Sequence, residues 1–260
     1  MKAVVFVKIL LIISLYCCQA FAIKPERIYH TRPLDFKMNY KEFKIKTPDN
    51  FNINIWEIES EIQIRTGKTI IICAGDAGNM GYYLRQANVL HQNGFKVILF
   101  DYRGFGESDD FKIDTTLLFH NEFLLDYETV LKEVKSKNNG SIGVWGFSMG
   151  GYFPMVLKEK PDFIILDSAM LNLEEILHRL NKPDLKIPKN SLKVLPNHIP
   201  TVAFWGQKDK ITIASDNTLW NKNQVNIYYY GGHMQLFQSM DEVKIVKIIE
   251  LFAILPYENK

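Results

Sequence analysis

The sequence predicts one α/β domain, in which helices cover both faces of a mostly parallel β-sheet. Short apolar runs alternate along the chain with segments of helical period, which is typical of a parallel sheet. Most of these runs are continuously apolar, as expected for strands that are buried on both faces. The chain has 260 residues, 47% of them hydrophobic and 23% charged. Such a chain can build one large core, and the composition excludes a disordered or low-complexity protein.

The period of the apolar side chains predicts the individual elements. Residues 44–47 and 51–56 alternate between apolar and polar side chains, which indicates half-exposed antiparallel strands. Continuous apolar runs indicate strands at 69–73, 96–100, 142–145, 163–166 and 202–205, and the last strand is expected at 225–230. Helices are expected at 117–134, 171–181 and 243–255, with a further helix after residue 148. No internal repeat or long linker divides the chain, so we expect a single domain over residues 23–260.

The first 22 residues are predicted to be a secretory signal peptide. Lys2 and Lys8 precede a short apolar run at 9–16, and small residues at Ala20 and Ala22 fit a cleavage site before Ile23. The alternative is an uncleaved membrane anchor. The uncharged stretch 9–22 has 14 residues, fewer than the roughly 20 that span a bilayer. The sequence therefore predicts an exported protein, periplasmic or secreted, with no membrane span after cleavage.

Charge and cysteine content narrow the range of partners. The net charge of +2 and the lack of a basic stripe argue against binding to nucleic acid. Two of the three cysteines lie in the signal peptide, so Cys73 alone remains and no intrachain disulfide is expected. No group of Cys, His, Asp or Glu has the spacing of a metal site. We therefore expect no metal and no cofactor, and the sequence does not indicate an oligomeric state.

The strongest local motif lies at residues 146–151, which read Gly-Phe-Ser-Met-Gly-Gly. This motif follows a predicted strand and precedes a predicted helix, which is the context of a nucleophile elbow. The chain must reverse sharply there, and it holds Ser148 in a strained conformation above the edge of the sheet. Side chains at Gly146 and Gly150 would obstruct that turn. The alternative is a glycine-rich turn with an incidental serine.

An acid and a base for this serine follow in the order of a Ser-Asp-His triad. Asp209 comes shortly after the strand at 202–205, and His233 follows the strand at 225–230. Each residue comes just after a different parallel strand, so all three are expected at one sheet edge. Ser148 is predicted to attack, His233 to transfer the proton and Asp209 to orient the imidazole. Asp167, which ends the strand at 163–166, is a weaker alternative for the acid.

With these residues the chain resembles the α/β-hydrolases over nearly all of residues 23–260. Residues 101–108 are similar to the loop after the fourth strand in many members, where Arg103 is expected to brace neighbouring loops. Residues 74–79 stand where such enzymes carry the oxyanion loop, and the resemblance implies that the backbone N–H groups of Asp76 and Met149 hold the oxyanion. Relatives often have His-Gly followed by a neutral residue here, whereas this chain has Asp76. We expect its carboxylate to point away, toward the amides at 77–79.

The resemblance implies an exported serine hydrolase of the carboxylesterase, lipase or thioesterase type. Its substrate would be a small-molecule or lipid ester, cleaved through an acyl-enzyme on Ser148. Residues 168–199 leave room for only a small cap with one helix, which predicts an open site. Two alternatives remain: an exported serine peptidase or amidase, because the same triad serves both bonds, and a catalytically silent binding protein on the same fold.

Overall fold

The computed structural model describes residues 23–60, 65–194, 198–217 and 224–254. Its main sheet has eight strands in the order β10-β9-β8-β7-β4-β6-β3-β2, and a separate pair joins β1 to β5. The strands are β1 Lys24–Pro25, β2 Tyr40–Lys46, β3 Asn52–Ile58, β4 Thr69–Cys73, β5 Ala77–Gly78, β6 Lys96–Phe100, β7 Ile142–Phe147, β8 Phe163–Asp167, β9 Thr201–Gly206 and β10 Gln224–Tyr229. The helices are η1 Pro33–Phe36, η3 Met80–Tyr83, α2 Leu84–Gln92, α3 Asn121–Lys137, α4 Met149–Val156, α5 Leu173–Leu180, η4 Ala214–Asn217, α6 Leu236–Ser239 and α7 Glu242–Ile254.

The predicted α/β architecture is confirmed. Strand β3 is antiparallel to both β2 and β6, and all other pairs in the main sheet are parallel. Residues 44–47 alternate between exposed and buried side chains, as predicted, but β3 is not half-exposed, because residues 53–56 are all buried. Every residue of β4, β7, β8 and β9 is buried. Continuous apolar runs therefore mark the strands that helices cover on both faces.

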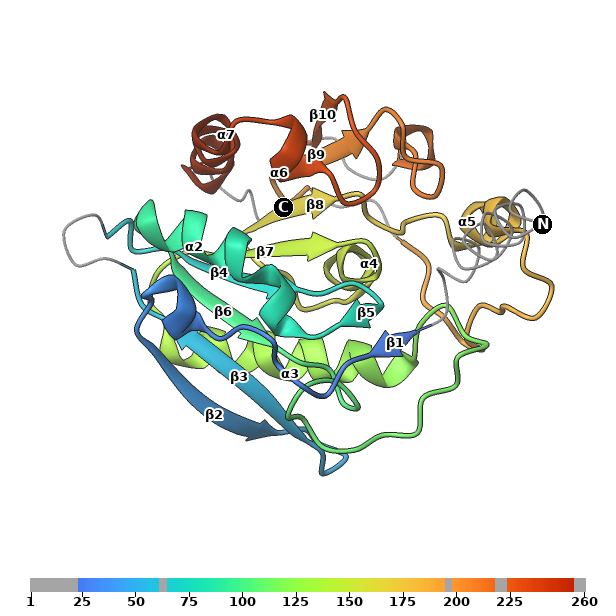
Figure 1. Cartoon of the computed structure of the whole chain (residues 1–260), viewed down its shortest axis with the longest axis horizontal. Coiled ribbons are helices and arrows are strands. Elements are labelled where there is room, and N and C mark those ends of the chain that lie inside the picture. The colour runs from blue at the N-terminus through green and yellow to red at the C-terminus, as the bar shows by residue number, and fades with distance from the viewer. Residues whose placement is uncertain (1–22, 61–64, 195–197, 218–223, 255–260) are drawn as a thin grey trace, which may run out of the picture.

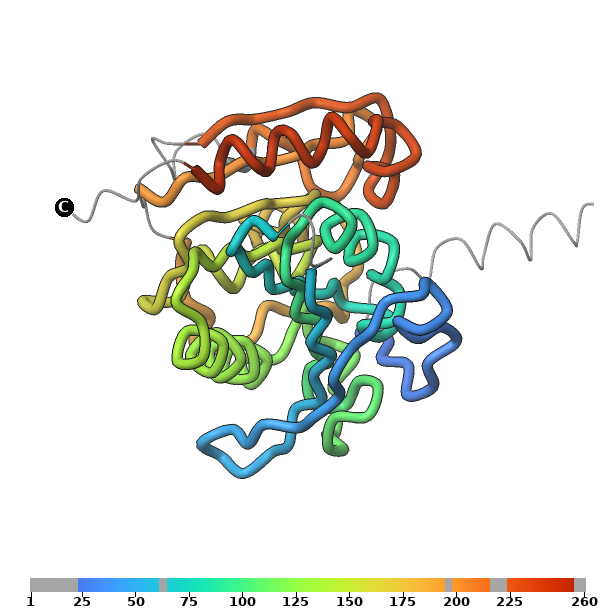
Figure 2. The backbone as a smooth tube through the Cα atoms, turned by 90° about the vertical axis from the view of Figure 1, so that its left-hand side faces the viewer, coloured from blue at the N-terminus to red at the C-terminus, as the bar shows by residue number. Residues whose placement is uncertain are grey.

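Helices pack on both faces of the sheet (Figure 1). Helices α2 and α7 contact each other, and α2 packs on β6 while α7 packs on β8 and β9. Helix α3 lies on the other side of the strands from α2, as Figure 2 shows. Trp56, Trp145 and Tyr127 are among the largest fully buried side chains of the core between these layers. The packed core holds the sheet in place, and with it the strand ends at which the candidate site lies.

The carboxyl ends of the central strands face a small cap. In Figure 1 the arrowheads of β7 and β8 point toward the side on which α4, α5, β1 and β5 lie. Helix α5 is the helix of the predicted one-helix cap, and its N-terminus is capped by Asn172, whose side chain accepts from the N–H of Glu175. Strand β1 pairs in parallel with β5, with Lys24 opposite Ala77. This pairing places the start of the described chain beside the loop that follows β4.

Two further local features differ from the expectations, the start of helix α3 and the strands β1 and β5. Helix α3 begins at Asn121 rather than at residue 117, because Leu117 pairs with Lys186 and the N–H of Leu118 donates to the carbonyl of Lys186. Helix α4 contains Pro154, and the ammonium of Lys160 donates to the carbonyls of Pro154 and Met155 near the helix end. The two-residue strands β1 and β5 carry no sequence period and were not expected.

The predicted signal peptide, residues 1–22, lies outside the described residues. Ile23, the residue after the predicted cleavage site, is buried, and β1 begins at the next residue. Within the described ranges, no helix has the length and hydropathy that crossing a bilayer requires.

Candidate active site

Ser148 sits at the sharp turn between β7 and α4. Its backbone has φ 49° and ψ −116°, a region in which non-glycine residues carry strain of about 1–3 kcal/mol. A Cβ on Gly150 would overlap the carbonyl oxygen of Cys73, and a Cβ on Gly146 would overlap Gly151. The end of β8 supports the turn, since the N–H of Ser148 donates to the carbonyl of Asp167 at 3.0 Å. The strained serine and its flanking glycines match the predicted nucleophile elbow.

The structure brings the predicted serine, histidine and aspartate together. His233 Nε2 lies 2.9 Å from Ser148 Oγ, and His233 Nδ1 lies 2.7 Å from Asp209 Oδ2. The Ser148 side chain is buried, and the imidazole of His233 keeps 13% of its surface exposed. The three residues follow the ends of β7, β9 and β10, which lie at the same edge of the sheet because these strands are parallel. A serine, a base and an orienting acid thus form one hydrogen-bonded chain.

Thr212 is a fourth residue in this series of hydrogen bonds, and it was not predicted from the sequence. Its hydroxyl donates to Asp209 Oδ2 at 2.7 Å and lies 3.3 Å from His233 Nδ1. The N–H groups of Ile211 and Thr212 donate to Asp209 Oδ1. Burial alone would raise the pKa of Asp209, but the hydrogen bonds from His233 and Thr212 and the His233 charge hold it below its ordinary value. A threonine three residues after an aspartate at a strand end is the signal that could have found this contact.

The oxyanion loop follows β4 as expected, but among the described residues the amides at 77–79 do not contribute the hydrogen bond expected at the Asp76 carboxyl. Met149 is the first residue of α4, where N–H groups have no partner within the helix. Burial raises the pKa of the Asp76 carboxyl, against the effects of its own backbone N–H and the charges of His233, Lys182 and Lys24. The hydrogen bond that lowers this pKa comes from Asp76 itself and not from the amides at 77–79. The carboxyl group is also close enough to His233 for their charges to interact.

Asp167 does not orient the histidine. The hydrogen bond of His233 Nδ1 to Asp209 decides between the two acids that the sequence left as candidates. Asp167 is 4% exposed, and its Oδ1 is buried without a hydrogen-bond partner. Burial raises its pKa to about 7, although the charge of His233 and the side chains of Trp145 and Ser168 act in the opposite direction.

The loop at 101–108 braces the base of the site. Arg103 donates to Asp126 and to Asp49, and its guanidinium is almost fully buried. Asp101 accepts from the hydroxyl of Tyr29 and, at 2.7 Å, from the N–H of Met80. These contacts agree with the bracing role predicted for Arg103.

The fold and the Ser148–His233–Asp209 geometry define an α/β serine hydrolase. Residues 65–236 match the family model described as "Serine aminopeptidase, S33", which covers more than half of the chain and includes all three side chains. The chain belongs to this serine hydrolase family. Among the described residues, no cluster of His, Cys, Asp or Glu is arranged to hold a metal ion.

Solved structures share this fold. Esterase Pf2001 from Pyrococcus furiosus superposes with a TM-score of 0.72 at 20% identity, over 90% of this chain and 98% of that chain. XC6422 from Xanthomonas campestris, described as an α/β serine hydrolase without lid, has a TM-score of 0.57 at 16% identity, over 82% and 93% of the two chains. At these identities the likeness shows the fold alone.

Curated relatives match over shorter segments. An uncharacterised membrane protein of Saccharomyces cerevisiae, YNL320W, is 24% identical over 146 residues, 53% of this chain and 48% of its own length. The lysophosphatidylserine lipase ABHD12 of Danio rerio is 25% identical over 170 residues, 55% of this chain and 43% of its own length. The chain spans about half the length of the curated relatives it matches.

Proposed function

We propose that this protein hydrolyses carboxylic esters or thioesters through an acyl-enzyme on Ser148. The observation that carries the proposal is the hydrogen-bonded chain from Ser148 Oγ through His233 to Asp209, with distances of 2.9 and 2.7 Å. The fold does not need a strained serine beside a base and a buried acid to be stable, whereas nucleophilic catalysis does need this arrangement. The esterase and lipase descriptions of similar proteins support the substrate class.

Acylation begins when His233 Nε2 takes the proton of Ser148 Oγ as the oxygen attacks the carbonyl carbon. The carbonyl oxygen becomes an oxyanion, which the N–H groups of Met149 and Asp76 would stabilise. The carbon–oxygen or carbon–sulfur bond to the leaving group then breaks, and the imidazolium gives its proton to that group. Asp209 keeps a negative charge beside the imidazolium, since its hydrogen bonds hold its pKa low.

Deacylation repeats these steps with water. His233 removes a proton from the water molecule that attacks the acyl carbon, and the resulting imidazolium returns the proton to Ser148 Oγ as the acid leaves. The imidazole of His233 keeps 13% of its surface exposed, which lets it contact such a water molecule. No cofactor takes part in this scheme.

Serine peptidase or amidase activity is the second candidate. The description of the matching family as a serine aminopeptidase favours it, and the same triad cleaves esters and amides. The alternative outside the enzymes is a catalytically silent binding protein on the same fold.

The test is labelling of the purified protein with a fluorophosphonate probe. We expect the wild type to be labelled and both Ser148→Ala and His233→Ala to lose labelling while keeping the wild-type circular dichroism spectrum. A panel of p-nitrophenyl esters, thioesters and peptide p-nitroanilides then separates the first two candidates. Absence of labelling in folded wild-type protein would contradict catalysis and favour the silent binding protein.

We also propose that the protein is exported and cleaved between Ala22 and Ile23. The motif at Ala20 and Ala22 and the short apolar run at 9–16 support this. Mass spectrometry of the N-terminus of the protein made in its native host tests it. A chain that still begins at Met1 would contradict cleavage.

A further inference from the structure

A pocket of about 490 Å³ opens beside the candidate catalytic residues. Phe147, which directly precedes Ser148, and Met234, which directly follows His233, both line it. The rings of Phe147 and His233 also pack against each other, with centroids 5.2 Å apart. A group bound in this pocket therefore lies next to the serine and its base.

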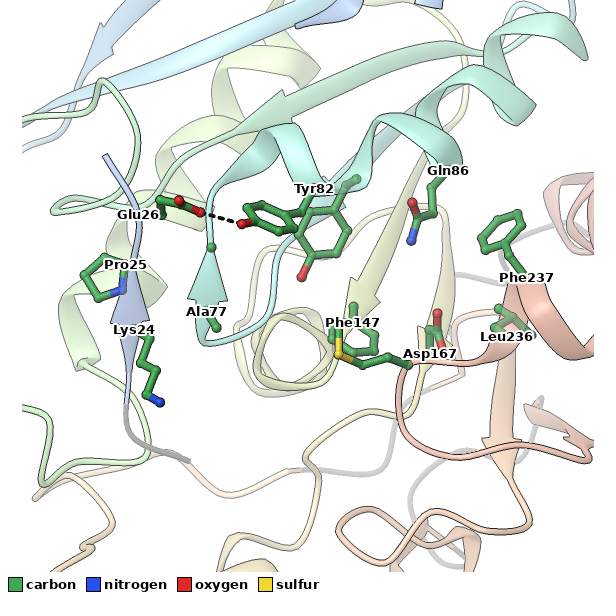
Figure 3. Close-up of a pocket in the computed structure, with 13 residues that line it drawn as sticks. Lys24, Pro25, Glu26, Ala77, Tyr82, Gln86, Phe147, Asp167, Leu236 and Phe237 are labelled. Carbon is green, nitrogen blue, oxygen red and sulfur yellow. Dashed lines mark hydrogen bonds between the residues drawn. The ribbon is translucent and has the colours of Figure 1, made fainter. Parts of the chain in front are cut away.

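The pocket has one apolar wall and one wall formed by the N-terminal strand. Figure 3 shows Phe237, Leu236, Gln86 and Asp167 on one side, and Lys24 with its neighbours on the other. Three of the polar side chains that line it have hydrogen-bond partners, those of Glu26, Tyr82 and Tyr83. The Tyr82 hydroxyl donates to Glu26 at 2.6 Å, and the Tyr83 hydroxyl accepts from the N–H of Gly75 at 2.7 Å.

Asp167 differs from these residues because one of its oxygens is unused. Oδ1 is buried and has no hydrogen-bond partner, although the side chain lines the pocket. A buried carboxyl oxygen without a partner is unfavourable, and such groups in folded proteins are almost always satisfied. The residue does not orient His233, so that role does not account for its presence.

Asp101 offers an internal comparison. Asp101 and Asp167 each stand at the carboxyl end of a central strand, and burial is the largest cause of the raised pKa of both, about 7 in each case. Both oxygens of Asp101 are used, one by the hydroxyl of Tyr29 and the other by the N–H of Met80. An aspartate that serves only to close a strand end can therefore be fully satisfied in this fold. Asp167, whose Oδ1 lacks such a partner, is a lining residue of a pocket that a ligand can fill.

We propose that Asp167 is a specificity-determining residue, whose Oδ1 accepts a hydrogen bond from a hydroxyl or ammonium group on the apolar part of the substrate. This inference rests on the proposed function, because it takes the molecule bound in the pocket to be the substrate of the hydrolysis. The apolar side chains of that wall bind the chain, and the unpartnered oxygen of Asp167 favours a chain that carries a donor. A chain that ends in a methyl group would leave Oδ1 without a hydrogen-bond partner.

The test measures binding and needs no turnover. Hexylammonium, 1-hexanol and hexyl methyl ether share an apolar chain, and only the first two carry a donor. Isothermal titration calorimetry compares the three ligands on the wild type, Asp167→Leu and Asp167→Asn. We expect the better donor ligand to bind the wild type about tenfold more tightly than the ether, the value of one charge-assisted hydrogen bond.

The variants separate hydroxyl from ammonium recognition. Leucine has no acceptor, so Asp167→Leu should bind all three ligands equally. Asparagine keeps a neutral acceptor, so Asp167→Asn should keep a preference for hexanol and lose one for hexylammonium. Asp110→Asn, a change at an exposed carboxylate, is the charge-matched control and should behave as the wild type does.

Equal binding of the ether and the donor ligands to the wild type would overturn the inference, and so would a donor preference that persists in Asp167→Leu. The binding measurements do not require catalysis, so the two proposals can fail separately. Asp167-dependent binding by a protein that fails to label with fluorophosphonate would reject the proposed hydrolysis alone. Labelling and ester turnover without a donor preference would reject the role of Asp167 alone.

Discussion

At the scale of single residues, Thr212 has the clearest consequence for the candidate triad. Its hydroxyl and the imidazole of His233 both bind Asp209 Oδ2. Replacement by valine keeps the shape of the side chain and removes the hydrogen bond, which is one of the contacts that lower the pKa of Asp209. The Asp209 carboxylate of Thr212→Val should then take up a proton at a higher pH than in the wild type.

We expect Thr212→Val to react with fluorophosphonate about tenfold more slowly, the loss that one hydrogen bond of about 1.4 kcal/mol produces. The part of its pH–rate profile in which Asp209 takes up a proton should move to higher pH. Thr212→Ser, which keeps the hydroxyl, should restore both the rate and the profile. A valine variant with the wild-type profile would show that Thr212 does not position Asp209.

At the scale of secondary-structure elements, Arg103 joins three parts of the fold. It donates to Asp126 of helix α3 and to Asp49 in the turn between β2 and β3, while its own backbone lies in the loop after β6. Its side chain and that of Asp126 are 1% and 0% exposed. Removing one partner of a buried pair leaves an uncompensated charge, which typically costs about 3–5 kcal/mol.

Arg103→Leu should therefore lower the free energy of unfolding by about 3–5 kcal/mol in urea titrations at neutral pH. Lys132→Leu is the matched control, because Lys132 pairs with Glu128 on the exposed surface of α3, where an ion pair contributes below about 1 kcal/mol. Similar losses in the two variants would contradict the bracing role of Arg103.

The elements also show what the sequence could and could not predict. Strands β4, β7, β8 and β9 were predictable because parallel strands covered on both faces require unbroken apolar runs. The positions of Ser148, Asp209 and His233 followed from the strand ends. The start of α3 was not predictable, since a tertiary contact with Lys186 sets it.

Two further features of the site depend on partners that are distant in sequence. Strands β1 and β5 are two residues each, too short for any period, and they form only because the N-terminal segment meets the loop after β4. The open oxygen of Asp167 is likewise a property of the assembled pocket. From the sequence, Asp167 was a candidate for orienting the histidine, and only the hydrogen bond between His233 and Asp209 decides that question.

At the scale of the whole molecule, Asp167 links the candidate site to stability. Burial raises its pKa from 3.8 to about 7, so the folded protein binds a proton that the unfolded chain has already released between these values. The unfolded state binds fewer protons there, and the stability contributed by this group falls as the pH rises from about 4 to about 7. Above pH 7 the folded protein carries an ionised, buried carboxylate with one oxygen unpaired.

Asp167→Asn cannot ionise and should escape this loss. We expect its melting temperature, relative to that of the wild type, to be higher at pH 8 than at pH 4, as measured by thermal unfolding at both values. Asp101, whose pKa is also about 7, remains in both proteins and cancels from the comparison. A difference between variant and wild type that stays the same at the two pH values would contradict the linkage. A gain in stability together with a loss of the preference for hexylammonium is the pattern expected when a destabilising residue is kept for function.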